Sequence, residues 1–212
     1  MSNWSTISSL ATAGGTLVLA IATFSSVRSA NRAARTAERA FQVALRPVLM
    51  PSRLQDPPEK VMWKEGRWTQ VGGGRGAVEQ TDDNIYLVIS LRNAGAGIAV
   101  IQGWRATAAP DTAGDLHRPE PDDFRRQLRD LYIAPGDCGF WQGAIRDHDD
   151  ASYTELRDTI AAGGRLAVFV LYSDHEGGQR TITLFSLTPT HDDSAWLTSV
   201  IRHWNLDRAD PR

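Results

Sequence analysis

The most constraining feature of the sequence is an uncharged segment close to its beginning. Residues 7–27 run for 21 positions without one charged side chain. As a helix, this segment is about 32 Å long, which matches the roughly 30 Å hydrocarbon core of a bilayer. Hydroxyl and glycine residues dilute its first half, but a spanning helix tolerates them because its backbone hydrogen bonds stay internal. We therefore expect residues 1–27 to form a transmembrane anchor.

Two alternatives to a retained anchor follow from the same segment. A cleaved signal peptide would place a basic residue before its apolar core, whereas no Lys or Arg precedes Arg28. A buried helix of a soluble protein would rarely run this far without a charge. We favour the retained anchor over both alternatives.

A basic collar follows the apolar segment directly. Its members are Arg28, Arg32, Arg35, Arg39 and Arg46. Glu38 is the single acid of residues 28–46, so the net charge there is +4. An excess of Lys and Arg beside a membrane segment indicates the cytoplasmic side. The sequence thus predicts a single-pass protein of the inner (plasma) membrane with its N-terminus outside and its C-terminal domain in the cytoplasm. The reversed topology, with an envelope-facing domain, is the alternative.

The spacing of the collar arginines places all five on one stripe of a continuous helix, so we expect a basic helical stalk over residues 28–46. One interpretation is a topology signal on a solvated stalk. The other is a helix that contacts anionic lipid headgroups. Nucleic acid is not an expected partner, because residues 47–212 carry 18 basic and 24 acidic side chains, a net charge of −6.

The remaining residues, 47–212, are long enough for one domain with its own core. Short apolar runs separated by turn residues predict strands at 48–50, 61–63, 67–71, 84–92, 98–104, 138–145, 166–172 and 181–187. Gly72–Gly76 is expected to be a flexible connector. Three helices are expected: one after Pro121 with Phe124, Leu128 and Leu131 on one face, one behind a capping box at Ser152–Glu155, and one over 194–204. The prediction is a mainly β fold: a β-sandwich with a few peripheral helices.

Four features of the layout carry a resemblance to a group of known proteins. They are the single spanning helix, the Arg- and Ala-rich stalk, the Arg-Pro-Val-Leu sequence at residues 46–49 and the strand–Asn-x-Gly–strand unit at 87–101. Together they resemble uncharacterised single-pass membrane proteins of high-GC bacteria, and the last unit is similar to one in bacterial immunoglobulin-like sandwiches. The resemblance implies a membrane anchor and an immunoglobulin-like β-sandwich domain, and it brings no catalytic residues with it.

No residue pattern predicts a catalytic, cofactor or metal site. The clusters at 147–150 and 191–193 mix His with Asp, but both precede expected helices, where acids favour the positive end of the helix dipole. Capping and solvation are therefore favoured over metal binding, and a solvated hairpin tip is favoured at 174–176. Cys138 is the single cysteine and is expected to be a small core residue.

The tryptophans suggest a surface for a partner. Seven are present, and Trp63 and Trp68 lie beside charged residues on an expected hairpin. Partial exposure there would mark a partner surface, whereas burial would make them part of the core. The resulting hypothesis is a membrane-anchored, non-enzymatic interaction module with the bilayer, anionic headgroups and an unidentified protein as partners and no cofactor. The alternative is a membrane-tethered ligand-binding protein or enzyme that uses the acidic and histidine-bearing loops.

Overall fold

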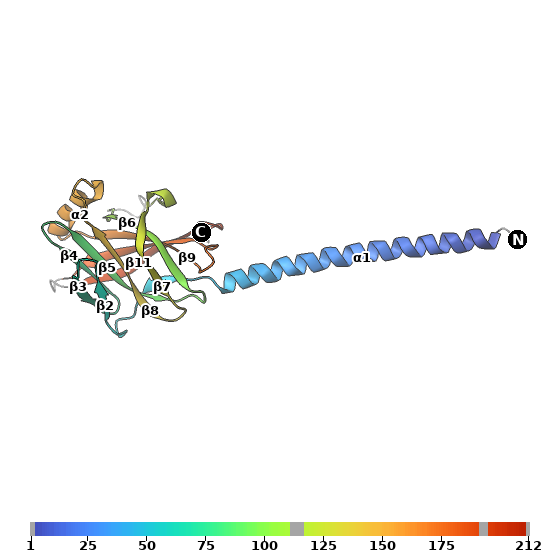
Figure 1. The fold of residues 1–212 in the computed structure, drawn as a ribbon, viewed down its shortest axis with the longest axis horizontal. Coiled ribbons are helices and arrows are strands. Elements are labelled where there is room, and N and C mark those ends of the chain that lie inside the picture. Colours follow the sequence, from blue (N-terminus) through green and yellow to red (C-terminus); the bar gives the residue numbers. More distant parts are fainter. Residues whose placement is uncertain (1–2, 111–116, 191–194, 211–212) are drawn as a thin grey trace. The chain divides into compact units, whose positions relative to one another are not determined.

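The computed structural model describes residues 3–110, 117–190 and 195–210 and divides into two compact units, residues 1–44 and 45–212. The first unit is one helix, α1 (Asn3–Ala44), drawn in blue in Figure 1. At 1.5 Å per residue it is about 63 Å long. Within it, Ile7–Phe41 is long and apolar enough to span a membrane. One continuous helix therefore covers the described part of the predicted anchor and the predicted stalk as far as Ala44.

Threonine hydroxyls in α1 are satisfied by the helix itself. Thr12, Thr16 and Thr23 each donate a hydrogen bond to the carbonyl oxygen four residues earlier, at 2.8–2.9 Å. A hydroxyl that bonds its own backbone needs no partner from water or lipid. The polar residues of the apolar segment are thus compatible with a position inside a bilayer.

The basic stripe of the helix has four members rather than the predicted five. The side chains of Arg28, Arg32, Arg35 and Arg39 are exposed on α1. Arg46 lies beyond the end of the helix, in the second unit, where its guanidinium donates to Thr181 Oγ1 at 3.3 Å. The expected helix continuation to residue 46 is therefore wrong, because the chain turns into the β domain at Leu45.

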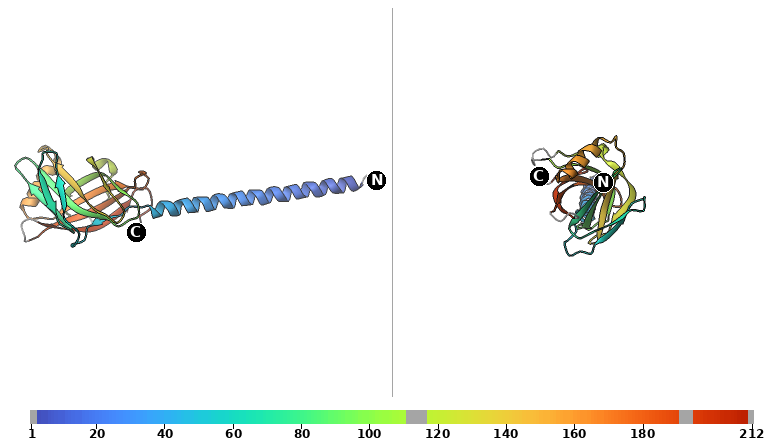
Figure 2. Two further views of the ribbon diagram at one scale, coloured as in Figure 1. Left: turned by 60° about the horizontal axis from the view of Figure 1, so that its bottom comes forward. Right: turned by 90° about the vertical axis from the view of Figure 1, so that its left-hand side faces the viewer.

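The second unit is mainly β, as predicted. Its strands are β1 (Leu49–Pro51), β2 (Glu59–Met62), β3 (Trp68–Val71), β4 (Arg75–Gln80), β5 (Ile85–Asn93), β6 (Ala99–Ala108), β7 (Arg125–Ile133), β8 (Cys138–Ile145), β9 (Leu166–Ser173), β10 (Thr181–Pro189) and β11 (Trp196–Asn205). All pairs are antiparallel. One edge of β5 pairs with β8 and the other with β1 and β4, after which the order is β11, β10, β9, β6 and β7. This sheet curls back on itself, and β2 and β3 form a separate hairpin (Figures 1 and 2).

The core fills the inside of the curled sheet and continues on its outside. The interior cluster joins side chains of β5, β6, β8, β9 and β10 to Tyr153 and Leu156 of the helix α2 (Ala151–Ala161). Outside, Val61 and Trp63 of the β2–β3 hairpin region cover β5. Strands β5, β9 and β10 are buried at nearly every position, because both of their faces are covered.

Two expected helices are strands. The segment after Pro121 forms one 3-10 turn, Pro121–Asp123, and then β7, in which Leu128 is 88% exposed rather than buried. The segment expected to be a terminal helix is β11, which pairs with β10 along its whole length. Apolar residues three and four apart do not distinguish a helix from a strand when a neighbouring strand offers a free edge.

Two local predictions are also corrected. The N-cap of α2 is Asp150, whose carboxylate accepts from the Ser152 backbone at 3.0 Å, and Glu155 binds the Ala108 backbone instead of completing a capping box. The glycine-rich segment is a packed turn that leads into β4. A Cβ at Gly73 would lie 2.0 Å from the Arg53 carbonyl oxygen, so the backbones approach too closely for a flexible connector.

Candidate ligand-binding groove

Strands β7 and β8 follow one another in the chain but separate after the turn that joins them. Asn93 fixes this turn. Its backbone N–H donates to Asp137 O at 3.0 Å, its carbonyl accepts from the Gly136 backbone, and its Nδ2 donates to Ile133 O at 3.0 Å. Asn93 is fully buried, and its Oδ1 also accepts from the Val48 and Gly95 backbones. The point from which the two strands diverge is therefore rigidly held.

A bulge carries β7 away from its neighbour β6. Ile101 of β6 is opposite Leu131, but Gly103 is opposite Arg126, so residues 127–130 face the single residue Gln102. Bulges interrupt a ladder and redirect side chains, and they are frequent beside functional sites. Here the bulged segment forms one wall of an opening between β7 and β8.

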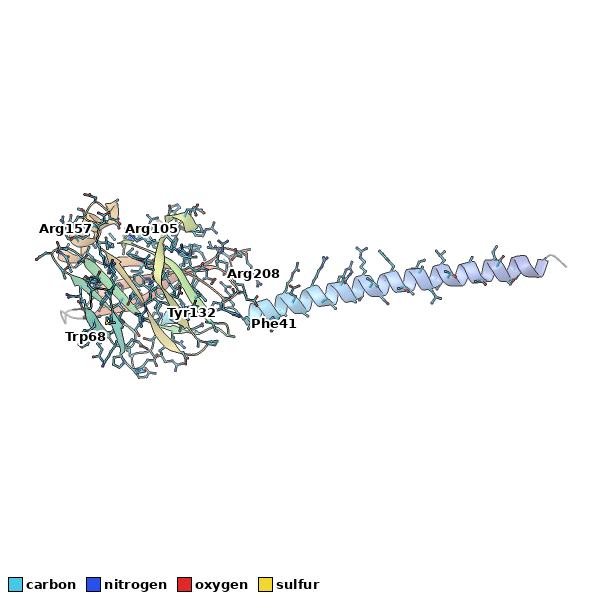
Figure 3. The ribbon with its side chains drawn as sticks, viewed as in Figure 1. Phe41, Trp68, Arg105, Tyr132, Arg157 and Arg208 are labelled. Atoms are coloured by element: carbon cyan, nitrogen blue, oxygen red, sulfur yellow. The ribbon has the colours of Figure 1, made fainter. Side chains whose placement is uncertain are left out.

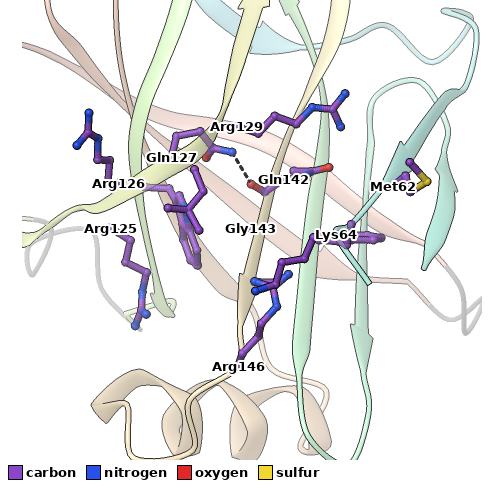
Figure 4. Close-up of a pocket in the computed structure, with 13 residues that line it drawn as sticks. Met62, Lys64, Arg125, Arg126, Gln127, Arg129, Gln142, Gly143 and Arg146 are labelled. Carbon is purple, nitrogen blue, oxygen red and sulfur yellow. Dashed lines mark hydrogen bonds between the residues drawn. The ribbon is translucent and has the colours of Figure 1, made fainter. Parts of the chain in front are cut away.

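The opening is a groove of about 600 Å³. It is lined by Met62, Trp63, Lys64, Trp104, Arg125, Arg126, Gln127, Leu128, Arg129, Gln142, Gly143, Ala144 and Arg146 (Figure 4). One hydrogen bond bridges the two walls, from Gln127 Nε2 to the Gln142 carbonyl oxygen at 3.3 Å. A groove of this size is within the range that small-molecule sites occupy.

Trp63 and Trp104 give the groove an aromatic base, and the fully buried Trp141 packs against Trp104 behind it. Trp104 and Trp141 meet edge to face with ring centroids 5.4 Å apart. Gly143 makes room for them, since a Cβ there would lie 2.7 Å from Trp141 and 3.0 Å from Trp104. The Arg125 guanidinium lies 5.3 Å from the Trp104 ring centroid, in a cation–π arrangement.

The charge of the lining is entirely positive. It contains Lys64, Arg125, Arg126, Arg129 and Arg146, and no acidic residue. Arg125 pairs with Asp150, and Arg146 pairs with Glu65 at 2.5 and 3.1 Å. Within the described residues, Lys64, Arg126 and Arg129 are exposed and form no ion pair. The groove therefore keeps basic groups that are available to an anion.

Three buried polar atoms of the lining lack a hydrogen-bond partner within the part of the chain that the structure describes. They are Gln127 Oε1, Gln142 Oε1 and Trp63 Nε1. Gln142 is 9% exposed and Trp63 is 3% exposed. Unpaired buried polar atoms are rare in native proteins because each one costs free energy, so a group of them beside one groove indicates a binding site.

The two tryptophans predicted to mark a partner surface have different environments. Trp63 is buried against Tyr86 with ring centroids 5.0 Å apart, so of the two alternatives it follows the one in which it is part of the core. Trp68 is 64% exposed and lies on the surface of the domain (Figure 3). In the β2–β3 register it is opposite Met62, itself 58% exposed and part of the groove lining.

The two acidic and histidine-bearing loops that the structure describes, at 147–150 and 174–176, are each held by their own contacts. His148 Nε2 lies 3.0 Å from the Asp83 carbonyl oxygen, and its ring stacks on Tyr153. Asp174 is buried and accepts hydrogen bonds from the Gly178 backbone and Gln179, so it shapes the hairpin turn. The cluster at 191–193 lies outside the described residues. Over 3–110, 117–190 and 195–210, no three His, Cys, Asp or Glu side chains gather in a way that could hold a metal ion.

Cys138 is held as a thiol. Burial, followed by a hydrogen bond to Asp56 and the charge of that carboxylate, raises the pKa of Cys138 to about 11. The sulfur lies 3.3 Å from Asp56 Oδ2. Because the thiolate is the nucleophilic form, this cysteine is unreactive near neutral pH.

The sequence contains one sign of the groove that hydrophobic periodicity does not reveal. Three arginines fall within residues 125–129, a density that no other five-residue segment of the sequence reaches. A helix would carry these three arginines on one side with no second wall opposite them. The strand and its bulge instead place Gln127 and Arg129 in the lining of one groove. The sequence predicts the second wall, β8, as a strand at 138–145, but no sequence pattern indicates what this strand faces.

Comparison with protein-family models, with curated proteins and with solved structures finds no match to this chain.

Proposed function

We propose that this protein is a single-pass, membrane-anchored binding module without catalytic activity of its own, and that the groove between β7 and β8 is its recognition site. Helix α1 anchors the chain in the inner membrane, and the β domain binds a partner. The observation that carries this proposal is the combination of unpaired cations, at Lys64 and Arg129, with the unpaired buried Oε1 of Gln142 in one groove. A site with such groups is completed by a bound molecule.

The collar supports the proposed orientation. Arg28, Arg32, Arg35 and Arg39 follow the apolar segment, and basic residues in this position favour the cytoplasmic side. In the proposal the N-terminus is therefore outside and the domain is in the cytoplasm. The same arginines are available to anionic headgroups of the inner leaflet. An immunoglobulin-like relationship of the domain is part of the proposal on the resemblance alone.

The test is affinity purification of the full chain from membranes of its own host in a mild detergent, beside a groove variant with Lys64→Gln, Arg126→Gln and Arg129→Gln. Proteins and extracted small molecules are both identified by mass spectrometry. We expect a near-stoichiometric partner with the natural chain and its loss with the groove variant, because the variant removes the unpaired cations and leaves the core untouched.

A matched control removes the same charge elsewhere. Arg157, Arg165 and Arg208 are exposed and lie outside the groove lining. A chain with these three changed to Gln should retain the partner. The proposal fails if neither the natural chain nor the control retains anything, or if the groove variant retains the same molecule in the same amount.

A further inference from the structure

We propose that the groove takes an amphipathic acid with three parts: an apolar chain, an N–H or O–H donor next to it, and a terminal carboxylate. An N-acylated amino acid has this chemistry. The inference rests on the proposed function, since it names the ligand of the same groove. Each part of the ligand follows from a different part of the lining.

The apolar chain is inferred from exposed apolar side chains beside the tryptophan base. Leu128 on one wall is 88% exposed and Met62 on the opposite side is 58% exposed. Trp68 extends this apolar surface, because it faces Met62 across the hairpin. Exposed apolar side chains that gather around one groove favour an apolar ligand group, since covering them removes their surface from water.

The carboxylate is inferred from the basic groups without an ion pair. In the view of Figure 4, Arg129 extends from β7 toward β8, and Lys64 enters from the side of the β2–β3 hairpin. A guanidinium binds a carboxylate through two parallel hydrogen bonds, and an ammonium adds a compact charge. Both groups are exposed, so screening by salt is expected to weaken their effect.

The donor is inferred from the orientation of the two glutamines. Gln127 Nε2 is committed to the Gln142 carbonyl oxygen, which fixes Gln127 Oε1 as an acceptor without a donor. Gln142 Oε1 is a second buried acceptor of the same kind. A simple fatty acid anion has an apolar chain and a charge but no hydrogen-bond donor next to the chain, whereas the amide of an N-acyl amino acid supplies an N–H there. Trp63 Nε1 is a donor without a partner, and it can donate a hydrogen bond to the carbonyl oxygen of such an amide.

The experiment uses the full chain in phosphatidylcholine nanodiscs and isothermal titration calorimetry, with empty nanodiscs subtracted. Three probes share one octanoyl chain: N-octanoylglycine, N-octanoylsarcosine, in which a methyl group replaces the amide hydrogen, and N-octanoylglycinamide, which lacks the charge. We expect one molecule of N-octanoylglycine per chain. Loss of the donor or of the charge should each weaken binding by about tenfold, the effect of one well-placed hydrogen bond or ion pair.

Two variants separate the parts of the site. Lys64→Gln with Arg129→Gln should lower the affinity for N-octanoylglycine by about five- to tenfold, most strongly at low salt. Gln142→Met should bind N-octanoylglycine and N-octanoylsarcosine with more nearly equal affinity, because the acceptor is gone. Arg165→Gln, an exposed arginine outside the lining, should bind all three probes as the natural chain does.

A long-chain probe distinguishes a membrane-held ligand from a soluble one. N-hexadecanoylglycine placed in the nanodisc should displace N-octanoylglycine if the ligand comes from the bilayer. If only the soluble probe binds, the source is the surrounding solution. Both results support the ligand class.

The remaining outcomes overturn the inference. Equal affinity of the natural chain for N-octanoylglycine and N-octanoylsarcosine rules out the donor. Absence of binding by all three probes rules out the class. If a glutamate-rich peptide then binds, and Lys64→Gln with Arg129→Gln abolishes this binding, the proposed function stands and the groove recognises an acidic protein segment. If this peptide also fails and affinity purification retains nothing, the proposed function fails as well.

Discussion

The Gln142 side chain has a polar atom that lowers the stability of the unliganded domain and that serves as an acceptor in the proposed site. Its Oε1 is buried and has no partner among the described residues, in a side chain that is 9% exposed. A buried polar atom without a partner costs about 1–3 kcal/mol. The cost falls on the unliganded domain and is recovered when a donor binds, as is common where function requires a locally unfavourable group.

Replacing Gln142 with Met should therefore stabilise the unliganded protein while it weakens recognition of the donor. The two side chains have similar length, and Met has no polar atom to leave unpaired. We expect the free energy of unfolding to rise by about 1 kcal/mol. Urea unfolding of the full chain in a non-ionic detergent, followed by tryptophan fluorescence, measures this change. Gln80→Met, at an exposed position, is the control and should stay within about 0.5 kcal/mol. A fall in stability at Gln142 would show that its amide is satisfied.

At the scale of the element, α2 depends on one acid that also holds a groove residue. Asp150 caps the helix through the Ser152 backbone and pairs with Arg125 of β7. Burial by itself raises the pKa of Asp150, but hydrogen bonds from Arg125 and Ser152 outweigh it and hold the pKa below its usual 3.8. A carboxyl group with a lowered pKa in the folded state stabilises the fold above its unfolded pKa. This contribution is lost as the pH falls through the folded value.

Asp150→Ala should accordingly lower the free energy of unfolding at neutral pH, and this loss should be smaller at acid pH. Loss of an N-cap costs about 0.5–2 kcal/mol, and here Arg125 also loses its partner. We expect the difference in unfolding free energy between variant and natural chain to shrink as the pH falls below about 4. Denaturant unfolding at a series of pH values checks the trend. Asp158→Ala, in an exposed pair with Arg157, should have an effect below about 1 kcal/mol. An Asp150 effect that is constant from neutral to acid pH would contradict the role of the carboxylate.

How far the sequence predicts an element depends on whether its pattern is local. The run at 166–172 is apolar at every position, the runs at 84–92 and 181–187 are rich in Ile, Leu, Val, Thr and aromatic residues, and each is a strand in the structure. In contrast, Trp196, Leu197, Val200, Ile201 and Trp204 have a spacing that fits either a helix or a strand. Pairing with β10 decides the outcome for β11, and that pairing depends on residues far away in the chain.

The groove could not be predicted for a related reason. Its walls are consecutive strands that would ordinarily form a hairpin, and they separate because Asn93 holds the turn while the segment 127–130 bulges from β6. The Asn-x-Gly unit is visible in the sequence, but the contacts of Asn93 with Ile133 and Val48 are long-range. A one-dimensional pattern shows that Arg129 is present and does not show which side chains share its surface.

At the scale of the whole molecule, the charges of the two units differ in a way that bears on topology. Four of the five collar arginines lie on one stripe of α1, whereas residues 47–212 carry a net charge of −6. Orientation in the membrane depends on Lys and Arg near the end of a span, and acidic residues contribute little. The acidic domain therefore does not oppose the collar, and the proposed cytoplasmic location of the domain depends on Arg28, Arg32, Arg35 and Arg39.

Changing these four arginines to Gln should abolish the uniform orientation of the chain. We expect a C-terminal fluorescent protein that matures only in the cytoplasm to give full signal with the natural collar. An alkaline phosphatase fusion at the same position, active only outside the cytoplasm, should give none. In the collar variant, the phosphatase should gain activity as the fluorescence falls, because α1 retains its apolar segment and loses the signal that keeps its C-terminal end inside.

The control removes four exposed arginines from the domain instead, at Arg118, Arg157, Arg165 and Arg208, and should leave both reporters unchanged. Phosphatase activity with the natural collar would establish the reversed topology, since the domain would then face the envelope.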